Sequence, residues 1–238
     1  MTLSSKLAGL GAELRRPGAT AAGKLFRITQ RAARALHLAP AFNLARCVIV
    51  ETDRAPKPTR GLADLIVRRG EERDVPALAS VDGRDPAHFR ARLARGDLVY
   101  LAQLDDEILC HSWLHRGPSS FDEERSIFAR WALDDATFWS YDAMTRPEAR
   151  LSGVAARLFE VMLRDVFAVH GARRVRGFIY DDNRPSLLLH ERMGFTAVAT
   201  VTALALPLVK WVRWESGATR RQWLLRRDSD LALPPAGG

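Results

Sequence analysis

Expected strands and helices alternate along residues 62–206. Short runs rich in apolar residues predict strands at 65–68, 98–104, 108–115, 138–145, 175–180 and 196–206. The helical period predicts helices at 74–81, 86–95, 153–170 and 185–192. Strands and helices in this order predict an α/β fold with a mixed sheet covered by helices.

The helix expected at 153–170 has the clearest pattern. Its apolar side chains recur at i, i+3, i+4 and i+7, and they are Ala155, Leu158, Phe159, Met162, Leu163, Val166 and Phe167. Gly171 follows as a C-terminal cap. Asp105-Asp106 joins the strands at 98–104 and 108–115, which predicts a hairpin there.

Both ends of the chain differ from this middle part. Residues 24–38 form an amphipathic pattern with Arg27, Arg31 and Arg34 on one side, which predicts a basic N-terminal helical extension. Residues 47–52 are a short β-branched run before a proline-rich linker, so we place a boundary near Gly61. The resulting segments are 1–60, 61–207 and 208–238, the last holding a strand pair at 208–215 and 220–225.

The net charge of +8 comes from the two ends. Residues 1–46 hold eight basic side chains against one acidic, residues 208–238 hold six against three, and the middle holds 22 against 24. The basicity of the chain therefore does not by itself make the middle part a nucleic-acid binder. For residues 1–46 two alternatives stay open: a peripheral contact with an anionic membrane surface or partner, and a helix docked on the domain with its arginines in water.

The sequence argues against a membrane span, a secretory signal, a zinc site and a disulfide framework. No apolar run approaches the length of a membrane span, and the N-terminus lacks the pattern of a secretory signal. Cys47 and Cys110 stand far apart with no CxxC spacing, so neither a zinc site nor a disulfide framework is expected. We therefore expect a cytoplasmic protein without a metal.

Two short motifs carry candidate chemistry. Arg150-Leu151-Ser152-Gly153-Val154-Ala155-Ala156 lies at the start of the long helix, where unpaired N–H groups and the helix dipole can bind a pyrophosphate. An N-cap at Ser152 followed by a tight turn is the structural alternative. The second motif runs from Asn183 to Phe195, and its Ser186 and His190 share a helix face.

These motifs resemble the GNAT acetyltransferases. The family's R/Q-x-x-G-x-G/A loop matches Arg150–Ala155, and its N-x-x-S-x-x-x-Y-E-K-x-G-F segment matches Asn183–Phe195. The resemblance covers residues 65–206 and implies a GNAT-like, mostly antiparallel sheet flanked by helices, with acetyl-CoA as the acyl donor. It also implies that the amides of Leu151–Ala156 hold the pyrophosphate, that Asn183 and Ser186 contact pantetheine, and that backbone groups at Ala143–Thr145 polarise the thioester carbonyl.

The chain departs from this pattern at the residue that protonates the leaving thiolate. The family's tyrosine is replaced by His190, whose ordinary pKa near 6.5 suits an acid. Asp142 is the first candidate for the general base, ahead of Glu123, Glu124 and His111. An amine can also lose its proton to water, so a base is not required.

The expected reaction is direct acetyl transfer to a primary amine of a small molecule, with an amino sugar or an amino-acid-like compound as the acceptor. A non-catalytic acyl-CoA-binding or scaffold protein with basic ends is the alternative. Nucleic-acid binding through those ends is a third reading, to which Trp211, Trp214 and Trp223 leave some room. The oligomeric state stays open, a homodimer included.

Overall fold

The computed structural model describes residues 43–58, 62, 64–121, 130–205, 208–226 and 232–233. The expected helix at 24–38, the remainder of the extension before Asn43, and the candidates Glu123 and Glu124 lie outside these residues. No helix in the described ranges is both long and apolar enough to cross a membrane.

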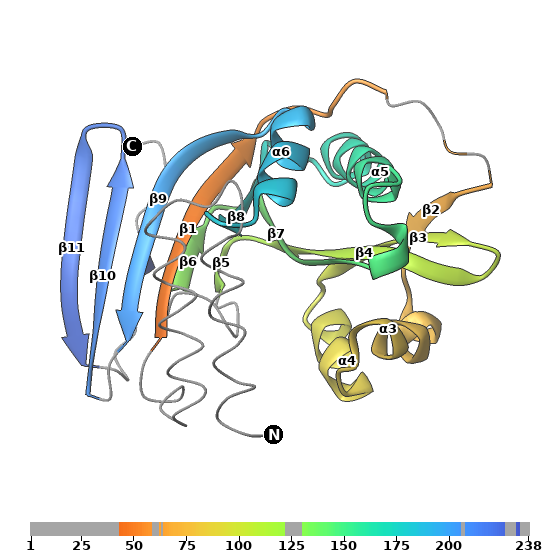
Figure 1. Ribbon diagram of the computed structural model, residues 1–238, viewed down its shortest axis with the longest axis horizontal. Coiled ribbons are helices and arrows are strands. Elements are labelled where there is room, and N and C mark those ends of the chain that lie inside the picture. Colours follow the sequence, from red (N-terminus) through yellow and green to blue (C-terminus); the bar gives the residue numbers. More distant parts are fainter. Residues whose placement is uncertain are drawn as a thin grey trace, which may run out of the picture.

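A nine-stranded sheet forms the centre of the molecule (Figure 1), with the strand order β11-β10-β9-β1-β8-β7-β4-β3-β2. Only β7 and β8 pair in parallel within it. Its strands are β1 (Asn43–Thr52), β2 (Ile66–Arg69), β3 (Leu98–Leu104), β4 (Glu107–Arg116), β7 (Thr137–Thr145), β8 (Arg174–Tyr180), β9 (Thr196–Ala205), β10 (Val209–Ser216) and β11 (Thr219–Arg226). The prediction of a mixed, mostly antiparallel sheet flanked by helices is confirmed.

Helices cover both faces of this sheet. The helices are α3 (Val75–Asp82), α4 (Pro86–Ala94), α5 (Val154–Ala168) and α6 (Arg184–Arg192), with short 3-10 turns η1 (Glu72–Asp74) and η2 (Pro147–Ala149). Alternation along β4 divides the core: Cys110 and Leu114 pack with α5, while Trp113 packs with Phe89 of α4 on the other side. The two layers of helices therefore lie on opposite faces of β4.

Local sequence signals place the helix ends. Asp85 accepts a hydrogen bond from the Ala87 N–H at 2.8 Å and caps α4, with Pro86 as the first helical residue. The predicted apolar stripe of α5 is buried. Gly171 follows α5 with φ +67°, where glycine carries no Cβ penalty.

The strand β1 is central to the sheet, although the sequence placed it before a boundary near Gly61. It lies between β8 and β9 and pairs antiparallel with both, for example Ile49 with Phe178 and with Ala199. β10 and β11 extend the same sheet beyond β9. A boundary near Gly61 would place β1 outside the domain, whereas the structure places β1 inside its central sheet.

A small sheet was not expected from the sequence. It has the order β12-β6-β5, from β5 (Ser119–Phe121), β6 (Arg130–Leu133) and β12 (Ala232–Leu233). Its strands are two to four residues long, which is too short to leave a clear period in the sequence.

Candidate functional site

The parallel strands β7 and β8 are paired only at their beginnings. The ladder joins Thr137–Ser140 to Arg174–Gly177 and extends no further in the described residues. At its last pair the backbones are close, because a Cβ at Gly177 would stand 2.9 Å from the Ser140 carbonyl oxygen. Beyond this point β7 stays paired with β4 through Thr145, so one side of β7 from Tyr141 to Thr145 has no β8 partner.

A bulge in β7 lies at the same point. The pairing with β4 shifts between His111 and Trp113, and Asp142 has φ +50°, an uncommon value for a residue other than glycine. The expected pantetheine contacts Ala143 and Thr145 follow directly, with Ala143 exposed and Thr145 half-buried. The structure thus brings a local irregularity and an open strand side together where the sequence predicted thioester contacts.

The loop before α5 is shaped by two residues of positive φ. Leu151 has φ +65° and is 98% exposed, and Gly153 has φ +91° and is the N-cap residue of α5. The Ser152 hydroxyl donates to the Ala149 carbonyl at 2.7 Å and accepts from the Val154 N–H at 3.4 Å. The N-cap of α5 is therefore Gly153, one residue after Ser152, so the alternative in which Ser152 is the N-cap is wrong.

Two N–H groups of the first turn of α5 remain for a ligand. The Arg157 N–H donates to the Gly153 carbonyl at 3.0 Å, whereas no acceptor in the described ranges pairs with the N–H of Ala155 or Ala156. No carboxylate lies in this first turn. An exposed helix N-terminus of this kind binds anions through its dipole and its free donors.

The Arg150 side chain connects this loop to β7. Its Nε donates to the Thr145 carbonyl oxygen at 3.4 Å, and the side chain is exposed. The end of β7 and the start of α5 are therefore near each other, as a ligand bound to both would require.

The helix α6 carries the second motif. The Asn183 side chain accepts from the Ser186 N–H at 3.3 Å, so Asn183 is the N-cap of α6. This is the capping arrangement that the sequence left open beside pantetheine contact. Asn183 is exposed and Ser186 is half-buried.

His190 has surroundings that the sequence did not predict. Its ring is 7% exposed and packs edge-on against Phe159 of α5 and Phe195, each with a centroid distance of 4.9 Å. Its Nδ1 lies 2.8 Å from the Ser186 carbonyl oxygen, which can only accept, so Nδ1 carries a proton. Burial lowers the pKa of His190 to about 4, although the bond to Ser186 favours the charged form.

This environment does not suit the acid role expected of His190. At neutral pH a group with a pKa of about 4 is almost entirely uncharged. The one proton of the neutral ring is engaged by the Ser186 carbonyl, which leaves Nε2 without a proton to give. Helix periodicity alone did not reveal that the His190 ring would pack between two phenylalanines.

Asp142 is also not suited to its expected role as a base. Arg84, in the α3–α4 connection, and Arg92 of α4 both donate to its carboxylate, with Arg84 Nη2 2.9 Å from Oδ1 and Arg92 Nη1 2.6 Å from Oδ2. Burial alone would raise the pKa of Asp142, but the two arginines outweigh it and lower the pKa. A carboxylate held in its charged form by two cations is a weak acceptor for a substrate proton.

His111, a weaker candidate for the base, is fully buried beside this group. In the described residues neither ring nitrogen has a hydrogen-bond partner. Burial lowers the pKa of His111 to about 4, so the ring is neutral near pH 7. A 0% exposed side chain cannot meet a substrate in this conformation.

A second polar cluster on the same face was missed from the sequence. Asp97 accepts from His115 Nδ1 at 2.6 Å and from Tyr141 Oη and Arg95 Nη2. Burial favours a raised pKa for Asp97, yet these three bonds lower it. Arg92 links the two clusters because its guanidinium lies 4.8 Å from the centre of the Tyr141 ring. No local signal could have found them, since their members come from separate elements.

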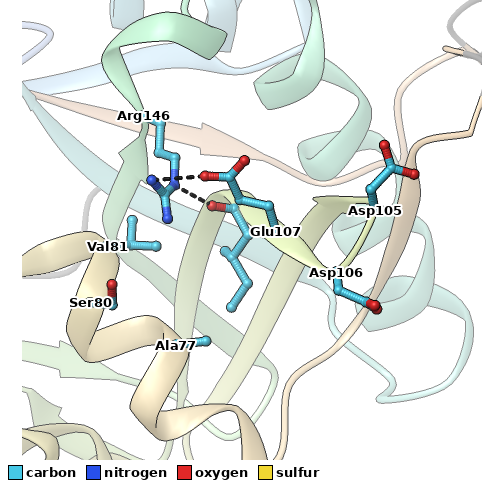
Figure 2. Close-up of a pocket in the computed structure, with 8 residues that line it drawn as sticks. Ala77, Ser80, Val81, Asp105, Asp106, Glu107 and Arg146 are labelled. Atoms are coloured by element: carbon cyan, nitrogen blue, oxygen red, sulfur yellow. Dashed lines mark hydrogen bonds and ion pairs between the residues drawn. The ribbon is translucent and has the colours of Figure 1, made fainter.

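A pocket of about 310 Å³ opens between α3 and the β3–β4 hairpin (Figure 2). Its lining residues are Ala77, Ser80, Val81, Asp105, Asp106, Glu107, Ile108 and Arg146. Arg146, the residue after β7, contacts Glu107 Oε1 at 3.0 Å and donates to the Ile108 carbonyl at 2.7 Å. None of the predicted site residues lines this pocket. In the described ranges no cluster of three or more His, Cys, Asp or Glu could hold a metal ion.

No protein-family model matches this sequence, and no curated protein matches it. Solved structures do match its fold. A GCN5-related N-acetyltransferase from Kribbella flavida has a TM-score of 0.51 at 15% identity and covers 74% of this chain and 63% of its own. A protein from Drosophila has a TM-score of 0.50 at 16% identity and covers 81% of this chain and 68% of its own. An acetyltransferase of the GNAT family from Colwellia psychrerythraea has a TM-score of 0.48 at 11% identity, with 86% and 72% covered.

Proposed function

From the fold of the GCN5-related N-acetyltransferases, we propose that this chain transfers an acetyl or other short acyl group from acyl-CoA to a primary amine of a small molecule. One observation carries the proposal: the N-terminus of α5 lies near the part of β7 that has no β8 partner. A helix N-terminus suits a pyrophosphate, and an open strand side suits the amide groups of pantetheine. Coenzyme A contains both groups.

In this proposal the donor is held mainly by the backbone. The N–H groups from Leu151 to Ala156 bind the pyrophosphate, with those of Ala155 and Ala156 already available. Arg150 adds a cation beside the same loop. Backbone groups of Ala143 to Thr145 bind pantetheine, and Asn183 and Ser186 contact the same arm from α6.

The chemistry then depends on positioning and on stabilisation of the oxyanion. The neutral amine attacks the thioester carbonyl, whose oxygen accepts hydrogen bonds from the backbone near the bulge at Asp142. The C–S bond breaks, the thiolate of coenzyme A leaves, and water supplies its proton and removes the proton of the amine. His190 and Asp142 support the site by packing and ion pairing.

A covalent enzyme intermediate does not fit this chain. Both cysteines are buried, and burial raises the pKa of Cys110 to about 11 even though its contact with Thr145 lowers it. The reactive form of cysteine is the thiolate, which is scarce at such a pKa. Direct transfer within a complex of enzyme, donor and acceptor is therefore the proposed route.

The pocket beside Arg146 is the proposed place for the amine acceptor. Arg146 directly follows Thr145 at the end of β7, and Asp105, Asp106 and Glu107 are among the other residues that line the pocket. Its volume of about 310 Å³ is at the lower end of the range for small-molecule sites. An amino sugar or an amino-acid-like compound has a suitable size.

A panel of amines with acetyl-CoA tests the proposal, with free thiol measured as turnover and product mass as proof of transfer. We expect thiol release that depends on the amine, with a product heavier by one acetyl group. Binding of acetyl-CoA without turnover on any acceptor would instead support the acyl-CoA-binding scaffold.

A further inference from the structure

The outer face of the strands β9, β10 and β11 carries an ordered pattern that the proposed reaction does not use. The opposite face is buried through Val201, Val212 and Trp214, so the alternate residues of the three strands point outward. On β11 the outward positions Arg220, Gln222, Leu224 and Arg226 are all exposed. In Figure 1 these strands form the end of the sheet farthest from α3 and α5.

An apolar row crosses this outer face. Trp211 on β10 lies directly opposite Leu204 on β9 and Leu224 on β11, so the three side chains are neighbours on one face. Leu224 is 71% exposed, and Leu204 and Trp211 are half-buried. A row of neighbouring large apolar side chains that are exposed or half-buried indicates an interaction site.

Cations flank the row on both sides. Arg226 lies opposite Val209 on one side, and Arg213, opposite Thr202 and Gln222, lies on the other. Arg46 on β1 lies opposite Thr202 on β9, and Arg220 on β11 lies opposite Glu215 on β10. Glu215 contacts Arg213 and Arg220, and Asp181 contacts Arg46, so four arginines stand against two carboxylates.

We propose that this outer face of β9–β11 docks on an anionic lipid bilayer, with Leu204, Trp211 and Leu224 entering the headgroup region and the arginines contacting lipid phosphates. Tryptophan and aliphatic side chains favour the boundary between headgroups and acyl chains. Arginines near the surface add attraction to acidic lipids. Two of the three members of the row are leucines, which offer no ring for base stacking, so lipid fits this face better than single-stranded nucleic acid.

Co-sedimentation of the full chain with vesicles tests the proposal, comparing phosphatidylcholine alone with a mixture that contains roughly one third phosphatidylglycerol. We expect binding only to the mixed vesicles, and weaker binding as salt rises. Arg220→Glu should lower the partition coefficient about tenfold or more, and Leu224→Glu should lower it as strongly.

Two matched variants separate this face from a general effect of charge. Arg221 is exposed on the same strand but points to the other face, and Val169 at the end of α5 has the same 71% exposure as Leu224. Arg221→Glu and Val169→Glu should bind mixed vesicles nearly as the unchanged chain does. Equal losses in these controls, no loss with Arg220→Glu and Leu224→Glu, or no binding to mixed vesicles would overturn the proposal. Binding to a single-stranded oligonucleotide that these two substitutions weaken, without vesicle binding, would assign the face to nucleic acid.

Discussion

Arg84 and Asp142 are 58 residues apart in the chain, yet two guanidinium nitrogens of Arg84 donate to the two carboxylate oxygens of Asp142. Arg92 donates to the same carboxylate. Since both arginines belong to α3, α4 and their connection, while Asp142 forms the bulge of β7, these bonds fasten the helix pair to the sheet where β7 leaves β8. Asp142 thereby shapes the place proposed for the thioester.

We expect Asp142→Asn to lower the free energy of unfolding by about 2–4 kcal/mol, because it leaves two guanidinium groups without their shared carboxylate in a mostly buried site. Urea denaturation measures the loss. The control is Asp53→Asn, at an exposed position, which should change stability by about 0.5 kcal/mol or less. Equal values for the two variants would show that the ion pairs contribute nothing.

The unchanged chain and Asp142→Asn should also differ in how their stability depends on pH. The arginines lower the pKa of Asp142 in the folded state, so its contribution is complete above the unfolded value near 3.9 and is lost as pH falls through the lower folded value. The stability difference between the unchanged chain and Asp142→Asn should therefore be constant from pH 5 to 7 and shrink below about pH 4. A difference that grows on acidification would contradict the assignment.

For His190 we expect the phenylalanine variant to keep kcat within a few-fold on a good acceptor, because the buried neutral ring has no proton to give. Loss of a positioned acid would instead cost about 10² to 10⁴ in rate. A loss of that size, with acetyl-CoA affinity unchanged, would restore the acid role that the motif predicts.

The variant His190→Phe should also alter the dependence of stability on pH. The pKa of His190 is lowered to about 4 by burial, so between this value and the unfolded 6.5 the unfolded chain binds a proton that the folded chain does not. Stability of the unchanged chain should therefore rise with pH over this range, and the rise should be smaller in His190→Phe. His111, whose pKa is similarly lowered, contributes a further part of this rise in both proteins. An unchanged slope would mean that His190 is accessible to protons in the folded state.

The central position of β1 predicts a large effect of its core residues. Ile49 is 1% exposed between β8 and β9, so Ile49→Ala should cost about 2–5 kcal/mol in a single cooperative transition. Ile66→Ala, at 56% exposure in the edge strand β2, is the matched control and should cost about 1 kcal/mol or less. Similar small losses in both would mean that residues 43–52 are peripheral.

Local patterns in the sequence were sufficient for most elements of the fold. The stripe from Leu158 to Val166 and the glycine after α5 act within a few turns, so they could be read without knowing the sheet. β1 could not be placed in this way, because its neighbours β8 and β9 come more than 120 residues later. The linker that follows β1 indicated a domain boundary, whereas the position of β1 is determined by its hydrogen bonds to the distant strands β8 and β9.

In the candidate site too, local features were predictable from the sequence and features that depend on tertiary contacts were not. The loop at Gly153 and the cap at Asn183 were predictable because backbone conformation and capping are local. The protonation of Asp142 and His190 was not, since it depends on Arg84, Arg92 and two phenylalanines from other elements. The sequence identified both residues as candidates, His190 from a motif and Asp142 from its place on a strand, but the tertiary surroundings determine what each can do.

The most direct test of the account is the shift in melting temperature that acetyl-CoA causes in the unchanged chain and in two variants at Gly153. Ligand at about a hundred times its dissociation constant adds about 2.7 kcal/mol, which is a rise of roughly 5–10 °C for a chain of this size. Gly153→Ala and Gly153→Glu share the strain of φ +91°, and a Cβ there meets nothing closer than Leu62 at 3.9 Å, so their difference reports the carboxylate. We predict a clear rise in the unchanged chain, a reduced rise in Gly153→Ala and none in Gly153→Glu. No rise in the unchanged chain at about 1 mM acetyl-CoA, or equal rises in all three proteins, would contradict a donor site at the N-terminus of α5.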